Sequence, residues 1–256
     1  MEEINLRKFD IKKMIPSPVC VLIAKRNSGK SFLIRDIMSH NRDIPAGSVI
    51  SRTDKVAHFY DKFIPSILIH DSYKSELLQK IFDRQKKSIK EGWKNKRFFL
   101  IFDDVLSEAN TWKKDPLLQD VFFNGRHYNI LFLLAMQAPM GIVPALRSNI
   151  DYTFILKTSN HSDRKKLYEH YAGVFPSMAV FEKVLDACTE NYGCLVIDNT
   201  VNTNSISEQV FFYRADDHKE FLLCDERFWV KDNDKKNKPP VNPQVVKNIN
   251  VKKVKF

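Results

Sequence analysis

The stretch that decides the fold is Val19-Cys-Val-Leu-Ile23, followed by Ala24-Lys-Arg-Asn-Ser-Gly-Lys-Ser31 and then Phe32-Leu-Ile-Arg-Asp-Ile-Met38. An apolar run of strand length leads through a glycine-containing turn into an amphipathic segment. Such a turn directs backbone N–H groups, and the positive end of the helix dipole, at a polyphosphate. The stretch therefore predicts a nucleotide-binding loop composed of Ala24, Lys25, Arg26, Asn27, Ser28, Gly29, Lys30 and Ser31.

Two side chains of this loop have distinct chemical roles in such a site. Lys30 is expected to place its charge on the β- and γ-phosphates of ATP, and the Ser31 hydroxyl to bind Mg²⁺. One position departs from the usual G-x-x-x-x-G-K-[ST] pattern, because Ala24 stands where the first glycine is expected. Ala24 must then keep φ negative or accept a small strain.

Length and charge set the domain organisation. A chain of 256 residues is long enough for one nucleotide-binding α/β domain, expected over residues 19–230 after a lead-in over residues 1–18. The net charge is +10, and residues 231–256 contain 8 of the 41 basic residues but only 2 of the 31 acidic ones. Residues 231–256 are therefore predicted to be a basic, flexible tail that either contacts nucleic acid or is simply solvated.

The termini and the cysteines indicate the compartment. The four cysteines lack zinc-binding spacing and are expected to be free thiols. The start of the chain has no apolar core for a signal peptide, and the apolar run 130–136 is too short to span a bilayer. We expect a soluble, intracellular protein.

Two further apolar runs, at residues 98–102 and 130–136, have the length of strands and are apolar on both faces. Such runs are typical of buried parallel strands, whose ligand sites lie at the carboxyl ends. Residues 75–94 are predicted to be a basic amphipathic helix, with Leu77, Leu78, Ile81, Ser88 and Ile89 on its inner face. Its lysines either face a nucleic-acid backbone or are solvated.

Asp103 and Asp104 follow the first of these runs directly. Asp103 is placed to bind Mg²⁺, and Asp104 stands where many ATPases have a glutamate that activates the attacking water. Aspartate is shorter by one methylene, so the carboxylate must approach closer or act through a water. The alternative is that the pair caps the next helix.

Gln137 ends the second apolar run. If that strand lies between the loop strand and the Asp103 strand, the Gln137 amide comes close to the γ-phosphate and can sense hydrolysis; otherwise it satisfies a loop backbone. Arg126 and Arg147 flank the same strand. Either is a candidate arginine finger supplied to a neighbouring subunit, and a surface salt bridge is the alternative for both.

The order of these motifs resembles a known family. The segments 25–31, Phe102-Asp103-Asp104, 124–127, Gln137 and 146–152 are similar to those of the genome-packaging ATPases of nucleocytoplasmic large DNA viruses, the poxvirus type included, within the FtsK/HerA superfamily of P-loop NTPases. The resemblance covers residues 15–230. It implies a RecA-like α/β fold of the ASCE class, with a mostly parallel central sheet flanked by helices.

The resemblance also implies a function. Members assemble into rings, here expected to have five or six subunits, around double-stranded DNA and use ATP to move the genome into a preformed capsid. Capsid or portal-vertex proteins are then partners, and the host cytoplasm or viral factory and the virion are the expected locations. Two other functions stay open: a nucleotide kinase, although no arginine-rich lid is visible, and a nucleic-acid-binding protein with a degenerate loop.

Overall fold

The computed structural model describes residues 5–105, 114–203 and 205–237. The strands are β1 (Arg7–Lys8), β2 (Val19–Ile23), β3 (Gly47–Ser51), β4 (Ile69–His70), β5 (Phe98–Asp103), β6 (Ile130–Met136), β7 (Tyr152–Ile155), β8 (Gly193–Asp198) and β9 (Val210–Arg214). The helices are α1 (Lys30–Ser39), α2 (Asp54–Ala57), α3 (Ser75–Lys90), α5 (Pro116–Asn124), α6 (Pro144–Arg147), α7 (His161–Tyr171), α8 (Met178–Cys188), α9 (Ile206–Gln209) and α10 (Glu226–Asn237).

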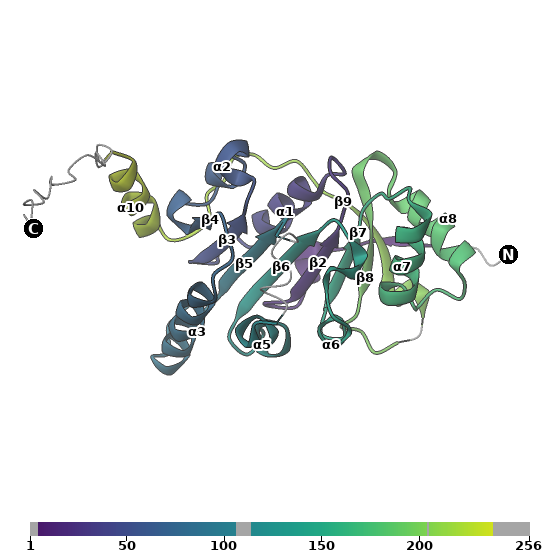
Figure 1. The fold of residues 1–256 in the computed structure, drawn as a ribbon, viewed down its shortest axis with the longest axis horizontal. Coiled ribbons are helices and arrows are strands. Elements are labelled where there is room, and N and C mark those ends of the chain that lie inside the picture. Colours follow the sequence, from purple (N-terminus) through teal and green to yellow (C-terminus); the bar gives the residue numbers. More distant parts are fainter. Residues whose placement is uncertain (1–4, 106–113, 204, 238–256) are drawn as a thin grey trace, which may run out of the picture.

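One sheet runs through the molecule in the order β1-β9-β8-β7-β2-β6-β5-β3-β4 (Figure 1). Each of these strands is parallel to the rest except β8, which is antiparallel to both of its neighbours. Strand β6 lies between β2 and β5, as the interpretation of Gln137 required. The carboxyl ends of β2, β5 and β6 therefore meet at one edge of the sheet.

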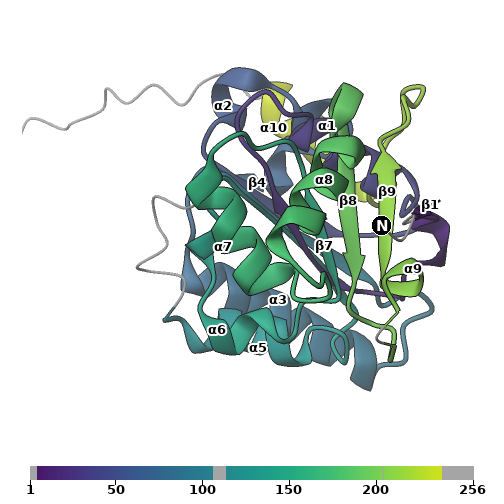
Figure 2. The same cartoon turned by 90° about the vertical axis from the view of Figure 1, so that its right-hand side faces the viewer.

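The two faces of the sheet carry separate hydrophobic clusters, because successive residues of a strand point to opposite sides. Even-numbered residues of β5 and β6 pack with α3, α5, α7 and α8. Odd-numbered residues such as Phe99 and Leu133 pack with α1 and with the segment from Tyr60 to Ile64. Figure 2 shows α7 and α8 beside β7 and β8. Helices thus cover both faces, which explains why β6 is apolar throughout and β5 is apolar up to its last residue, Asp103.

Helix α3 begins where predicted but ends at Lys90 rather than at residue 94, and its predicted inner face also needs a correction. Leu78, Ile81 and Ser88 are buried, whereas the side chain of Ile89 is 39% exposed. Gln85 belongs to the buried face instead, and its amide is satisfied there because it donates to the backbone carbonyls of Lys96 and Tyr128 at 2.7 and 2.5 Å. The lysines of α3 remain on the outer surface.

Both ends of the described chain differ from the sequence-based expectation. The lead-in contributes β1, which pairs with β9, and Phe9 behind it is buried. Helix α10 continues to Asn237, so residues 231–237 are helical where a flexible tail was predicted. Residues 238–256 lie outside the described residues. No helix in the described part of the chain has the length and apolar character needed to cross a membrane.

Candidate active site

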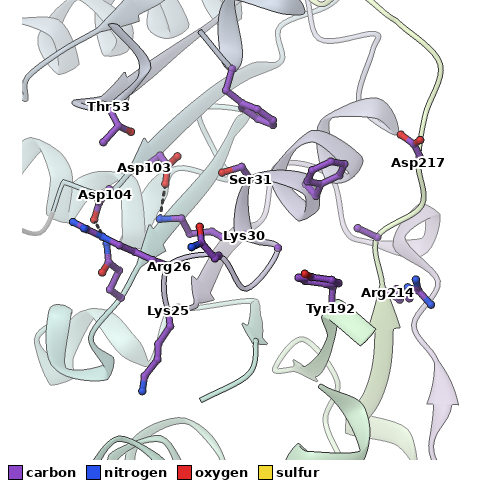
Figure 3. A pocket seen from close by; sticks show the side chains of 16 residues that line it. Lys25, Arg26, Lys30, Ser31, Thr53, Asp103, Asp104, Tyr192, Arg214 and Asp217 are labelled. Carbon is purple, nitrogen blue, oxygen red and sulfur yellow. Dashed lines mark hydrogen bonds and ion pairs between the residues drawn. The ribbon is translucent and has the colours of Figure 1, made fainter. Parts of the chain in front are cut away.

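A pocket of about 880 Å³ opens where β2, β5 and β6 end (Figure 3). It brings together residues of three segments that are far apart in the sequence. From the loop and the neighbouring strand ends it is lined by Lys25, Arg26, Asn27, Gly29, Lys30, Ser31, Asp103, Asp104 and Gln137. The sequence-based interpretation had assigned each of these residues to one nucleotide site.

The loop joins β2 to α1 without strain at Ala24. Ala24 is buried, keeps a negative φ and donates its N–H to the carbonyl of Met136 at 2.9 Å, so it extends the β2–β6 pairing. The left-handed positions are Asn27 (φ 59°) and Gly29 (φ 97°). Asparagine and glycine tolerate this conformation best. Alanine in place of the first glycine therefore needs no strained turn.

Lys30 and Asp103 form an ion pair in the pocket, with 2.9 Å between Nζ and Oδ1. Their side chains are only 13% and 7% exposed. The Tyr60 hydroxyl donates to the second oxygen, Oδ2, at 2.8 Å, and burial together with the charge of Asp103 raises the pKa of Tyr60. The Asp103 carboxylate is thus held in place on one side and faces Lys30 on the other.

The donor set fits Mg²⁺. Asp103 Oδ1 is buried, and apart from the Lys30 ammonium at 2.9 Å it has no polar partner among the described residues, so this charged oxygen of the pocket lining is able to bind a cation. Ser31 supplies a hydroxyl to the same pocket (Figure 3). Carboxylate and hydroxyl oxygens are the ligands that Mg²⁺ takes beside phosphate oxygens and water.

Gln137 contacts Asp104 directly, since its amide Nε2 donates to Oδ1 at 2.6 Å. The alternative role of Gln137, a partner for a loop backbone, is therefore not what the structure records. Asp104 has a left-handed backbone, with φ of 58°. Such a backbone costs about 1–2 kcal/mol for residues other than glycine, and strain of this kind clusters at functional sites.

The rest of the pocket lining was missed by the sequence interpretation. It consists of three aromatic residues, two charged residues, a threonine and an alanine: Phe32, Phe59, Tyr192, Arg214, Asp217, Thr53 and Ala215. Tyr192, Arg214 and Asp217 form the far wall, on the other side of the pocket from Asp103 (Figure 3). Tyr192 precedes β8 and lies beside the loop, because a Cβ added to Gly29 would come within 3.5 Å of the Tyr192 Cβ. In the sequence, only Phe32, the aromatic residue directly after Ser31, could have indicated this part of the pocket. The contact of Tyr192 with Gly29 joins distant segments and has no such local signal.

Neither of the two candidate arginine fingers, Arg126 and Arg147, lines the pocket of its own subunit. Arg126 forms an ion pair with Asp151, which also accepts from the Val19 N–H at 2.8 Å at the start of β2, the opposite end of that strand from the loop. The salt-bridge alternative is thus realised for Arg126. The guanidinium of Arg147 lies 5.8 Å from the ring centroid of Tyr171 and 3.4 Å from the carbonyl of Ile142.

Similar sequences occur in large DNA viruses. Protein L437 of Acanthamoeba polyphaga mimivirus is 44% identical over 223 residues, which cover 84% of this chain and 78% of that protein. Protein 088R of Invertebrate iridescent virus 3 is 35% identical over 242 residues, 88% of this chain and 92% of that protein. Protein 075L of Invertebrate iridescent virus 6 is 34% identical over 225 residues, with 84% and 87% covered. No family model matches the chain.

Solved structures share the fold. The genome packaging NTPase B204 of Sulfolobus turreted icosahedral virus 2 in complex with AMPPCP has a TM-score of 0.56 at 16% identity, covering 79% of this chain and all of that one. The same NTPase in complex with ATP-gammaS has a TM-score of 0.56 at 19% identity, covering 82% of this chain. The expected fold, a mixed α/β P-loop NTPase with a mostly parallel sheet, is thus confirmed.

Proposed function

For this chain, which belongs to the family of viral proteins that includes L437 of Acanthamoeba polyphaga mimivirus and 088R of Invertebrate iridescent virus 3, we propose the function of an ATP-hydrolysing motor that moves double-stranded DNA into a preformed capsid. One observation carries the ATPase part. The pairs Lys30–Asp103 and Gln137–Asp104 lie in one pocket, at the ends of three adjacent parallel strands.

This arrangement suits hydrolysis for electrostatic reasons. Lys30 and the loop N–H groups provide positive potential for the phosphates, and Ser31 and Asp103 would hold Mg²⁺. When bound, Mg²⁺ neutralises charge on the β- and γ-phosphates. Asp104 is the group that accepts a proton from water, and its bond to Gln137 fixes which way the carboxylate points. A bare binding protein has no need of this second pair.

The assembly is part of the same proposal. A homo-oligomeric ring of five or six subunits would let Arg126 or Arg147 reach a neighbour's nucleotide, since neither lines the pocket of its own subunit. The lysines on the outer surface of α3 offer a contact for the DNA backbone. B204, whose fold this chain shares, is a genome packaging NTPase, which supports this direction. The motor role implies partners among capsid or portal-vertex proteins and a location in the viral factory or the virion. These stay predictions, as does the resemblance to the poxvirus type.

ATP turnover tests the site. We expect release of inorganic phosphate to fall by about 10²–10⁴ in Asp104→Asn, the range that a positioned general base contributes. Gln137→Ala is expected to lower kcat with little change in KM, because the amide orients the base rather than the nucleotide. Asp83→Asn, at an exposed position of α3, is the matched control and should hydrolyse ATP like the wild type. Equal turnover in the wild type and Asp104→Asn would contradict the assigned base.

DNA dependence tests the motor. Duplex DNA should bind in a salt-dependent manner and raise turnover of the assembled protein. If the protein hydrolyses ATP but duplex DNA neither binds nor stimulates it, the ATPase assignment survives and the motor assignment fails. Transfer of labelled γ-phosphate to a nucleoside would instead indicate a kinase.

A further inference from the structure

Toward the C-terminal end of α1, the side chains of Asp36, His40 and His218 lie close together, although His218 is far from the other two in sequence. Asp36 lies on α1, and His40 is the residue that caps its C-terminal end. Because they are four residues apart, their side chains lie on the same side of that helix. His218 comes from the segment after β9. The potential ligand atoms of all three side chains lie within 4.8 Å of one another.

We propose that Asp36, His40 and His218 form a binding site for a divalent transition-metal ion, best suited to Zn²⁺. Two imidazoles and one carboxylate are ligands that zinc accepts with a fourth position left for water. Zinc–ligand bonds of about 2.0–2.2 Å in a tetrahedron place the ligand atoms about 3.3–3.6 Å apart. His40 Nε2 and Asp36 Oδ1 are separated by 3.4 Å.

The polar groups at this site are incompletely satisfied by protein. Both imidazoles direct Nε2 at the same carboxylate oxygen, Oδ1 of Asp36, and His218 takes it by a hydrogen bond. His40 Nε2 is buried and has no hydrogen-bond partner among the described residues. A buried nitrogen without a partner is costly, and a cation that replaces the hydrogen bond between His218 and Asp36 would be bound by His40 Nε2, His218 Nε2 and Asp36 Oδ1 together.

The surroundings hold the ligands in position. Asp36 is fully buried, and its other oxygen, Oδ2, accepts a hydrogen bond from the Tyr213 hydroxyl at 2.5 Å. Such outer contacts orient a metal-binding carboxylate. Arg35 donates to the backbone carbonyl of His218 at 2.8 Å, which fixes the segment that carries this histidine. The same segment lines the nucleotide pocket at Asp217, so the ion would join α1 to the far wall of that pocket.

Metal binding to the chelator-treated full chain tests the proposal independently of ATP turnover. Titration with ZnCl₂ in excess Mg²⁺, which occupies oxygen-only sites, should show one equivalent of zinc per chain and a higher Tm. Cobalt(II) chloride should give the intense visible absorption of a tetrahedral site. His40→Gln and His218→Gln should each weaken zinc binding by more than about 100-fold, beyond the loss typical of outer contacts.

His161→Gln is the matched control, since this histidine is 79% exposed and lies on α7. It should bind zinc like the wild type. Circular dichroism establishes that each variant is folded. The cobalt spectrum is recorded on the wild type, so it tests the site even if a variant fails to fold. The proposal is overturned if the wild type takes up no stoichiometric zinc, or if both variants bind it with unchanged affinity.

Discussion

Replacing Lys30 with methionine should destabilise the nucleotide-free protein, in addition to its effect on ATP binding. Two unit charges 2.9 Å apart, as in the Lys30–Asp103 pair, attract by about 1.4 kcal/mol in water and about 6 kcal/mol at an effective dielectric constant of 20. The pair is mostly buried but borders an open pocket, and the charges already bear a desolvation cost. We therefore expect Lys30→Met to lower the free energy of unfolding by about 2–3 kcal/mol.

Differential scanning calorimetry without nucleotide measures this loss. A loss of this size corresponds to a fall in Tm of about 4–12 °C for a domain of this length. Lys25→Met is the matched control: it removes a charge from the same loop, and no ion pair of Lys25 occurs in the described part of the chain. That variant should change stability by less than about 0.5 kcal/mol.

A double-mutant cycle separates the ion pair from other effects of the substitution. Asp103→Asn removes the charge that Lys30→Met leaves without a counterion, so the two losses should not add. The reasoning is refuted if Lys30→Met melts within a degree of Lys25→Met, or if the losses of Lys30→Met and Asp103→Asn are additive.

Two further predictions concern the fold. Gly47→Ala should destabilise by about 2 kcal/mol or more, because the new methyl group would lie 2.2 Å from an aromatic ring of the neighbouring strand; Gly173→Ala, with nothing within 4 Å, should be near neutral, and urea unfolding of both compares them. Arg126→Gln should cost about 1 kcal/mol near pH 7. Burial raises the pKa of Asp151, whereas the Val19 N–H and the Arg126 charge lower it, so losing Arg126 raises this pKa further. A carboxyl whose pKa is raised in the folded protein lowers the free energy of unfolding at pH values above its ordinary pKa of 3.8, where it is ionised. The stability difference between Arg126→Gln and the wild type should therefore shrink as the pH falls toward 3.8. A difference that grows on acidification would contradict this account.

The near half of the pocket was predictable from the sequence because its signals are local. Each of the segments around Lys30, Asp103 and Gln137 is an apolar run followed at once by polar residues. A run that is apolar on both faces must be a buried strand, and parallel buried strands end at the same edge of a sheet. The physics of burial therefore places these three residues at one edge of the sheet, whereas the closeness of Gln137 to Asp104 depends on β6 lying between β2 and β5, an order that the sequence left open.

The far half of the pocket depends on pairing between distant segments, which has no local signal. Tyr192 reaches Gly29 only because β8 runs antiparallel beside β7, and Arg214 lines the pocket only because β9 follows β8. Strand β1 is a similar case. Arg7 and Lys8 are charged, and they join the sheet through backbone pairing with β9, some two hundred residues later.

The geometry around Asp104 bears on how an aspartate can serve where many ATPases have a glutamate. Its backbone is left-handed, with φ of 58°, a conformation that aspartate adopts more readily than most residues. A left-handed residue directly after β5 turns the side chain in a direction that a continuing strand would not allow. The hydrogen bond from Gln137 then fixes the short carboxylate at the edge of the pocket. If Asp104 is the general base proposed above, its backbone direction and its partner on the adjacent strand would offset the missing methylene, so Asp104→Glu is expected to disturb the Gln137 contact rather than improve turnover.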